Sequence, residues 1–274
     1  MTAPSAVVRV APLESLLKRD RLIVLAALLA LAAVAWIDMA REARAMTLTG
    51  VCHCAGMKMS GPDTEPWAVS TLVPLFLMWA EMMVAMMIPS AAPMLLTFAL
   101  VQRKRREQEL PFVSTGFFLL GYIVVWTGFS ALAAVAQWIL HAQALLSPMM
   151  VSTSPLLGGG LLITAGIFQW TPLKNVCLSH CRTPLSFLLA DWREGARGAL
   201  LMGLKHGAYC TACCWFLMAL LFVAGVMNLW WIAIISVLVL VEKLAPRGLL
   251  FGKFAGVLLG AWGVWMIVAA WRGT

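Results

Sequence analysis

Residues 207–241 run GAYCTACCWFLMALLFVAGVMNLWWIAIISVLVLV, a stretch of 35 residues without a charged side chain. As one helix rising about 1.5 Å per residue, this stretch would measure roughly 50 Å, well beyond the hydrocarbon core of a bilayer, which is about 30 Å thick. We therefore predict a helical hairpin that turns near 225–228 and crosses the membrane twice.

Further apolar runs extend this pattern to both sides. A helix needs about 20 mostly apolar residues to cross a bilayer, because lipid offers no partner for a free backbone N–H or C=O. With the hairpin, the runs predict an all-α fold, a polytopic transmembrane helical bundle of about seven spans, with six as the alternative. The runs are 22–37, 72–99, 112–140, 156–173 and 254–271.

The composition of the 274-residue chain agrees with a membrane protein. Apolar residues make up 62% and charged residues 12%, against about 25% charged residues in soluble domains. Disorder is excluded, because the chain has ample apolar side chains to bury. The formal charge of +8 requires no nucleic acid, since the cytoplasmic loops of membrane proteins collect Lys and Arg. The expected partner of most of the surface is the lipid bilayer.

The loop charges predict the orientation. Basic residues gather at 103–106, 174–205 and 243–253, whereas the 38–70 loop balances its basic residues with acidic ones. The positive-inside rule then gives a multi-pass protein of the bacterial inner membrane with a cytoplasmic amino terminus. The 22–37 run is expected to be an uncleaved anchor; the alternative is a secretory signal cleaved after Ala45.

This organisation divides the chain in two. Residues 1–71 are expected to form the amino-terminal anchor span plus an extracytoplasmic loop. Residues 72–274 are expected to form a metal-binding membrane helical bundle.

Candidate metal ligands concentrate in a 38-residue stretch that holds five of the seven cysteines and two of the four histidines. Each of two segments presents thiols and an imidazole along one face of a helix, because the donors recur at spacings of three and four residues. Facing stripes of this kind could supply the donors for Cu(I) or Zn²⁺. A redox disulfide is less favoured, since the spacings differ from CxxC and a cytoplasmic location keeps thiols reduced. The candidate ligands are Cys177, His180, Cys181, His206, Cys210, Cys213 and Cys214.

A second group of soft donors lies in the first predicted loop, in the stretch CHCAGMKM. Thiolate, imidazole and thioether together suit Cu(I), because polarizable sulfur prefers a polarizable ion. The alternatives for this loop are a strained disulfide or pairing with a partner in an oxidising periplasm. The candidate residues are Cys52, His53, Cys54, Met57 and Met59.

A methionine stripe runs along the 72–99 segment, with Met78, Met82 and Met86 at i, i+4 and i+8. Methionine is also an ordinary filler of apolar cores, so packing alone is the alternative. Glu81 lies within the same segment, and an ionisable residue inside a span is a functional hypothesis by default. We expect the three methionines to form a thioether path for the metal near Glu81.

Three blocks of the sequence resemble a known family: MWAEMMVAMMIPSAAPM (78–94), FQWTPLKNVCLSHCRTPLSFL (168–188) and KHGAYCTACCWFLMALLFVAGVMNLWW (205–231) with VEKL (241–244). In this order they are similar to the bacterial family of predicted metal-binding integral membrane proteins, a domain of unknown function. The resemblance spans roughly residues 70–270. It implies a multi-span inner-membrane protein whose Cys and His blocks bind metal, and residues 1–69 have no counterpart in it.

Other chemistry is not indicated. The chain has no GxxxxGK[ST], no GxGxxG after a strand and no HExxH, so nucleotide hydrolysis and zinc proteolysis lack their usual motifs. Haem is not expected, because no second histidine is evidently placed to pair with His141 across the bundle. Glu242 and Lys243 are expected to snorkel from a span end to the interface.

The sequence therefore predicts an inner-membrane protein that binds a transition metal, Cu(I) ahead of Zn²⁺, in metal transport, sensing or delivery. The expected order is capture in the CHC loop, passage along the methionines and binding at the Cys/His cluster. A periplasmic metal chaperone or an electron-transfer protein is the expected protein partner. The alternative is a membrane redox enzyme, either a thiol/quinone oxidoreductase or a metal-dependent oxidase; the sequence does not decide whether the chain is an enzyme.

Overall fold

The structure, a computed structural model, describes residues 11–49, 69–147 and 150–272. Within these ranges the chain is built from helices, with one isolated bridge between Leu146 and Ser152. The predicted all-α class is confirmed. In chain order the helices are α1 (Ala11–Thr49), the short η2 (Val69–Thr71), α2 (Leu72–Glu107), α3 (Thr115–Ala142), α4 (Pro155–Phe168), α5 (Pro172–Arg182), α6 (Pro184–Asp191), α7 (Gly195–Ala219), α8 (Leu221–Ala224), α9 (Leu229–Leu244) and α10 (Gly248–Arg272).

Five segments of the described chain are helical, long and apolar enough to cross a membrane, and a bent α4–α5 pair could provide a sixth. This indicates a multi-pass membrane protein, but the predicted number of about seven spans is not confirmed. The difference comes from two short helices, since α4 has 14 residues and α9 has 16. The five segments are Leu22–Ala45, Val69–Glu107, Thr115–Ala142, Gly195–Ala224 and Gly248–Arg272.

The turn of the predicted hairpin lies where the sequence placed it. Gly225 has φ of 100°, a left-handed conformation that glycine adopts without steric cost. The Asn228 side chain then caps α9 by accepting a hydrogen bond from the backbone N–H of Trp231. The second arm of the hairpin is α9.

The break between α4 and α5 shapes the site. Proline disfavours a helical conformation in the residue before it, so Thr171 is extended and α5 restarts at Pro172. The Thr171 hydroxyl caps the new helix by accepting from the backbone N–H of Lys174. The two helices meet at a bend of 66°, which directs α5 onto α7.

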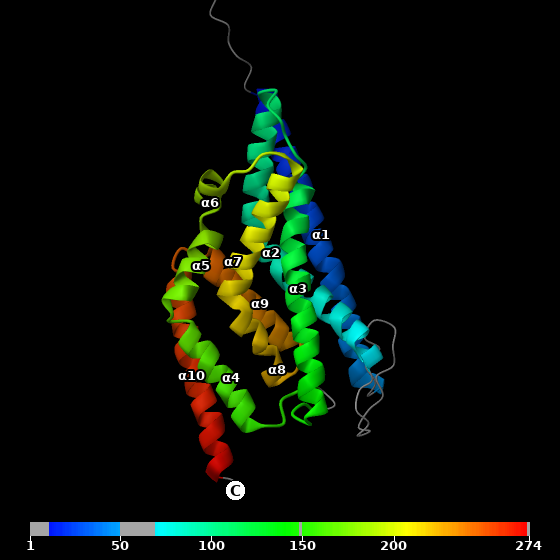
Figure 1. The fold of residues 1–274 in the computed structure, drawn as a ribbon, viewed down its shortest axis with the longest axis vertical. Helices are drawn as coiled ribbons and strands as arrows, with labels where there is room; N and C mark the ends of the chain where they lie inside the picture. Colours follow the sequence, from blue (N-terminus) through cyan, green and yellow to red (C-terminus); the bar gives the residue numbers. More distant parts are fainter. Residues whose placement is uncertain (1–10, 50–68, 148–149, 273–274) are drawn as a thin grey trace, which may run out of the picture.

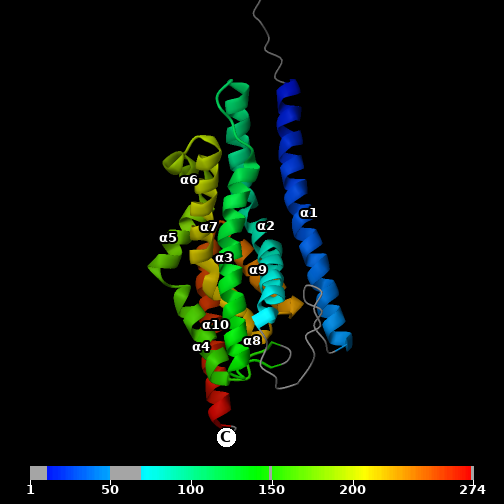
Figure 2. The same ribbon diagram turned by 45° about the vertical axis from the view of Figure 1, so that its right-hand side comes forward.

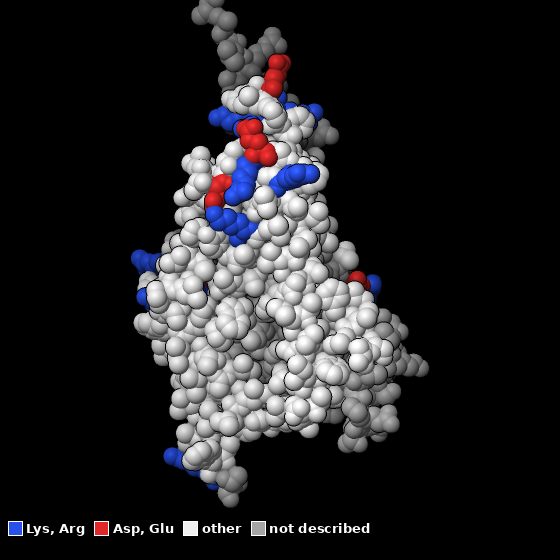
Figure 3. All heavy atoms as spheres, in the orientation of Figure 1, with Lys and Arg blue, Asp and Glu red and all other residues white. Residues whose placement is uncertain are grey.

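The helices form a bundle with three parts (Figure 1). The centre holds α2, α3 and α7, with α9 packed against α2. Helix α1 lies along α2 on one side of the bundle, and α4 with α10 forms a pair on the other (Figure 2). Lys, Arg, Asp and Glu side chains gather mainly at the end where α2 finishes and α7 begins, and a broad uncharged belt follows below (Figure 3).

Candidate metal centre

Three cysteines of α7 lie at the centre of the bundle. Cys210, Cys213 and Cys214 are each no more than 1% exposed. The thiols of Cys213 and Cys214 donate back to the carbonyl oxygen of Cys210, at 3.1 and 2.8 Å. The carbonyl lies one helical turn behind both thiols, so the spacing of α7 itself explains these contacts.

The Cys210 sulfur is surrounded by polar groups from two other helices. The Nζ of Lys243, on α9, donates to the Cys210 Sγ at 2.8 Å and to the Ser90 Oγ at 3.0 Å. The Tyr122 hydroxyl, on α3, lies 3.1 Å from the same sulfur. Lys243 is only 6% exposed, so its ammonium group depends on these contacts for stabilisation. An ammonium donor favours the thiolate form of its acceptor.

Helix α5 brings two more thiols to α7. Cys177 and Cys181 are both buried. Helix α5 packs on α7, and both thiols lie in the same buried core as Cys210, Cys213 and Cys214. The two cysteine segments predicted from the sequence therefore meet.

The two histidines behave differently from the cysteines. His206 is 2% exposed and stacks on Tyr122 with ring centroids 5.7 Å apart. His180 instead stacks on Tyr209 at 4.2 Å, and its Nδ1 lies 2.8 Å from the carbonyl oxygen of Val176. The predicted α5 imidazole is thus directed to Tyr209 and its own helix.

These side chains do not yet form a ready-made coordination shell. Among the described residues, no three His, Cys, Asp or Glu side chains are arranged to hold a metal ion. The hydrogen bonds of Cys213 and Cys214 explain this, since both thiols turn towards a carbonyl oxygen. A ligand role for the predicted donors stays a prediction.

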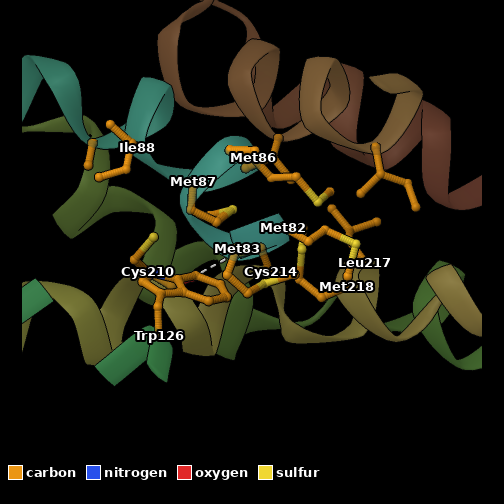
Figure 4. Close-up of a cluster of buried hydrophobic side chains, with 14 of the residues drawn as sticks. Met82, Met83, Met86, Met87, Ile88, Trp126, Cys210, Cys214, Leu217 and Met218 are labelled. Atoms are coloured by element: carbon orange, nitrogen blue, oxygen red, sulfur yellow. Dashed lines mark hydrogen bonds between the residues drawn. The ribbon is translucent and has the colours of Figure 1, made fainter. Parts of the chain in front are cut away.

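The methionine stripe of α2 packs on the same centre. Met78, Met82 and Met86 are at most 3% exposed. Figure 4 shows Met82 and Met86, with Met83 and Met87, over the part of α7 that carries Cys210 and Cys214. The Tyr122 hydroxyl connects α2 to the Cys210 sulfur, because it lies 3.1 Å from that sulfur and also donates to the Met87 carbonyl oxygen at 3.2 Å. The methionines thus lie beside the thiols, whereas the expected path placed them before the thiols.

Glu81 lies on the side of α2 that faces α1. Its side chain lines a pocket between α1, α2 and α3 together with Asp38. The Glu81 Oε1 atom is buried and has no hydrogen-bond partner among the residues that the structure describes. The remaining candidates, Cys52, His53, Cys54, Met57 and Met59, lie outside the described residues, and capture by them stays a prediction.

Sequence reasoning missed the charged residues of the site. Glu242 and Lys243 were expected to snorkel, yet they are 2% and 6% exposed. Glu242 Oε2 accepts from Lys174 Nζ at 2.7 Å, and the Gln169 side chain also accepts from that ammonium group. They stay inside because each charge has a buried partner. Treating them as ionisable residues within an apolar run would have marked them as functional.

Tyr122 was also missed. The chain has only two tyrosines, and both contact the site: Tyr122 at the Cys210 sulfur and Tyr209 at the His180 ring. Hydroxyl-bearing rings in an otherwise apolar bundle need a polar partner, which is the signal that would have singled them out.

The fold and this centre define a class: a helical multi-pass membrane protein with a buried cluster of cysteines and methionines. The family model of PpoB2, a copper chaperone, matches residues 76–266, so the chain belongs to this family. The match covers α3–α9, all but the first turn of α2 and all but the last six residues of α10. No curated protein and no solved structure matches the chain. The family supports the metal-related resemblance of the sequence and a copper-related role.

Proposed function

We propose that this chain is a membrane-embedded copper chaperone that holds Cu(I) between α5 and α7 and delivers it to a partner. The observation that carries the proposal is the burial of the α5 thiols in one core with those of α7, at the place where the two helices pack together. The family supports copper as the cargo. Thiolate and thioether ligands favour Cu(I), and both surround this position.

The donor set favours Cu(I) over Zn²⁺. Structural zinc sites are four-coordinate, and Cys or His ligands normally complete them. Here His180 is engaged with Tyr209 and Val176, which leaves the α5 segment with thiols alone. Cu(I) accepts fewer ligands, so a small set of sulfur atoms is sufficient once Cys213 rotates away from the Cys210 carbonyl.

The positive charge of Lys243 favours a site that is loaded with Cu(I). Two thiolates and one Cu(I) together carry a net negative charge, which is costly in an apolar interior. The buried ammonium group of Lys243, 2.8 Å from the Cys210 sulfur, offsets that charge. The residue therefore stabilises a loaded site without acting as a ligand.

We place the basic end of the bundle in the cytoplasm of a bacterial cell, with the protein in the inner membrane. Arg105 near the end of α2 binds the Glu194 carboxylate just before α7 at 2.7 Å, so both basic segments lie at one end. Charges gather there in Figure 3, and the positive-inside rule assigns that end to the cytoplasm. The partner is then a metal chaperone or an electron-transfer protein on the opposite side.

The test is Cu(I) binding by the full chain, purified without oxygen. We expect the wild type to hold stoichiometric Cu(I) against a chromophoric competitor. A Cys210→Ser/Cys213→Ser variant should lose affinity by more than the roughly 10–100-fold that outer-shell changes cost. Ala212→Ser is the matched control, since it adds a hydroxyl to the same turn of α7, and it should bind as the wild type does.

The opposite result points to the redox alternative. A wild type that binds no Cu(I), and whose thiols form disulfides that cycle when a quinone is added, would contradict the chaperone proposal. Counting free thiols before and after quinone addition distinguishes the two.

A further inference from the structure

The buried thiols pose a problem of access. Cys210, Cys213 and Cys214 are at most 1% exposed, so cargo cannot reach them directly from water. A chaperone must nevertheless load and release its ion. If the proposed function holds, the bundle needs an opening that leads to these sulfur atoms.

A pocket of about 470 Å³ lies between α1, α2 and α3, next to the thiols. Met83 of α2 and both Tyr122 and Trp126 of α3 line it. Tyr122 is the connection, because the same side chain lines the pocket and lies 3.1 Å from the Cys210 sulfur. Figure 4 shows Met83 and Trp126 beside Cys210 and Cys214.

Two polar groups in the wall of this pocket lack a partner within the described chain. Trp126 is 3% exposed, and its Nε1 has no hydrogen-bond partner. The Oε1 atom of Glu81 is buried and likewise unpartnered. An unpaired polar atom in an apolar wall is costly, so these atoms favour a pocket that receives a polar or charged visitor.

We propose that this pocket is the route by which Cu(I) reaches the thiols. This inference rests on the proposed function. The Glu81 carboxylate attracts the cation. Asp38, on the facing helix α1, contributes less attraction, because it pairs with Arg41 at 3.2 Å. Met83 offers a thioether and Trp126 an aromatic face, both suited to a soft cation. Tyr122 is the last side chain before the Cys210 sulfur.

The route differs from the path expected along Met78, Met82 and Met86. Of the α2 methionines, Met83 lines the pocket, whereas Met82 and Met86 lie over the thiols within the core and Met78 is buried. A lipid chain is a poorer occupant, because it satisfies neither the Glu81 carboxylate nor the Trp126 N–H.

The experiment separates the rate of loading from the final affinity. Cu(I) transfer from a chromophoric donor to the anaerobic full-length protein is followed by stopped-flow absorbance, and affinity is measured at equilibrium. Glu81→Gln and Ala80→Phe, which fills the pocket, should slow loading by at least about tenfold, the lower range of electrostatic guidance. Equilibrium affinity should stay unchanged, because the thiols are intact.

Met83→Leu should also slow loading, and Met94→Leu is its matched control on the same helix. Met94 is equally buried, at 1% exposed, and does not line the pocket. If Ala80→Phe does not yield folded protein, Leu77→Phe provides the obstruction from an exposed position of the same wall.

The outcomes distinguish the two proposals. Wild-type loading rates in Glu81→Gln and in the pocket-filling variant, with normal affinity, overturn the route but not the chaperone. A wild type that never binds Cu(I) overturns the proposed function itself.

Discussion

The α4–α10 pair and the α2–α7–α9 centre are built on opposite principles. In the pair, backbones touch: a Cβ on Gly166 would lie 2.6 Å from the Gly256 carbonyl oxygen, and one on Gly263 would lie 2.6 Å from that of Gly159. In the centre, the contacts come from sulfur, hydroxyl and ammonium groups on separate helices.

The exposure of the two regions follows the same division. Only 17% of the α10 span is buried within the bundle, against 56% of the span that contains α7. Lipid-facing helices associate through close packing of small residues, since lipid supplies little hydrophobic driving force. Polar groups are kept in the interior, where each can find a partner. Close backbone packing joins the helices of the pair, whereas paired polar groups characterise the centre.

The Lys174–Glu242 pair links α5 to α9 of the centre and gives the largest expected effect on stability. Both side chains are 2% exposed and their charged atoms are 2.7 Å apart. Glu242→Gln would leave a buried ammonium group without its counter-charge, which costs about 3–5 kcal/mol. Denaturant unfolding in detergent measures the loss.

The control for this pair is Asp191→Asn, which breaks the exposed pair with Lys205 and should cost about 0–1 kcal/mol. Replacing both partners with apolar residues, in Lys174→Met/Glu242→Leu, should recover much of the stability. Equal losses of stability in Glu242→Gln and Asp191→Asn would contradict the expected difference between the buried ion pair and the exposed one.

The glycine contacts of α4 give the next effect. Gly166→Ala places a methyl group against the α10 backbone and should destabilise the pair by about 1–3 kcal/mol. Gly160→Ala, on the same helix, meets nothing within 4 Å and should be neutral or stabilising by up to about 1 kcal/mol. Melting temperatures of both variants, with Cu(I) stoichiometry unchanged, would show that this region is structural.

The smallest expected effect on stability lies in the centre. Met82→Leu conserves volume and should cost less than about 1.5 kcal/mol. If its thioether supports the cargo, Cu(I) affinity should fall several-fold, because leucine offers no soft donor. Competition titration measures the affinity, with Met227→Leu as the control. An unchanged Cu(I) affinity would show that the methionine stripe only packs the core.

Sequence alone predicted the helical class, the turn at Gly225–Asn228 and the placement of thiols along one face of each cysteine helix. Each depends on local patterns, namely apolar runs, turn residues and i, i+4 spacing. The position of His180 could not be predicted, because an aromatic partner 29 positions along the chain, Tyr209, determines it. The burial of Lys243 likewise depends on Cys210 and Ser90, from two other helices.

The predicted number of about seven spans is not confirmed, for a related reason. Hydropathy measures apolar length, but Pro172 divides the predicted 156–173 run from the rest of its segment. The resulting short helix α4 is positioned by its packing against α10. No single run of sequence reveals that contact.

The adjacent positions of Glu242 and Lys243 have a consequence for the movement of α9. Turning this helix about its axis by one residue, about 100°, would in one sense carry the Glu242 carboxylate towards the sulfur atoms, and in the other sense carry the Lys243 ammonium group towards that of Lys174. Arg182 opposes such a rotation by gripping the carbonyl oxygens of Glu242, Ala245 and Pro246 at the end of the helix. Helix α9 is therefore held in one rotational position, and any movement that admits or releases the cargo must come from the neighbouring helices.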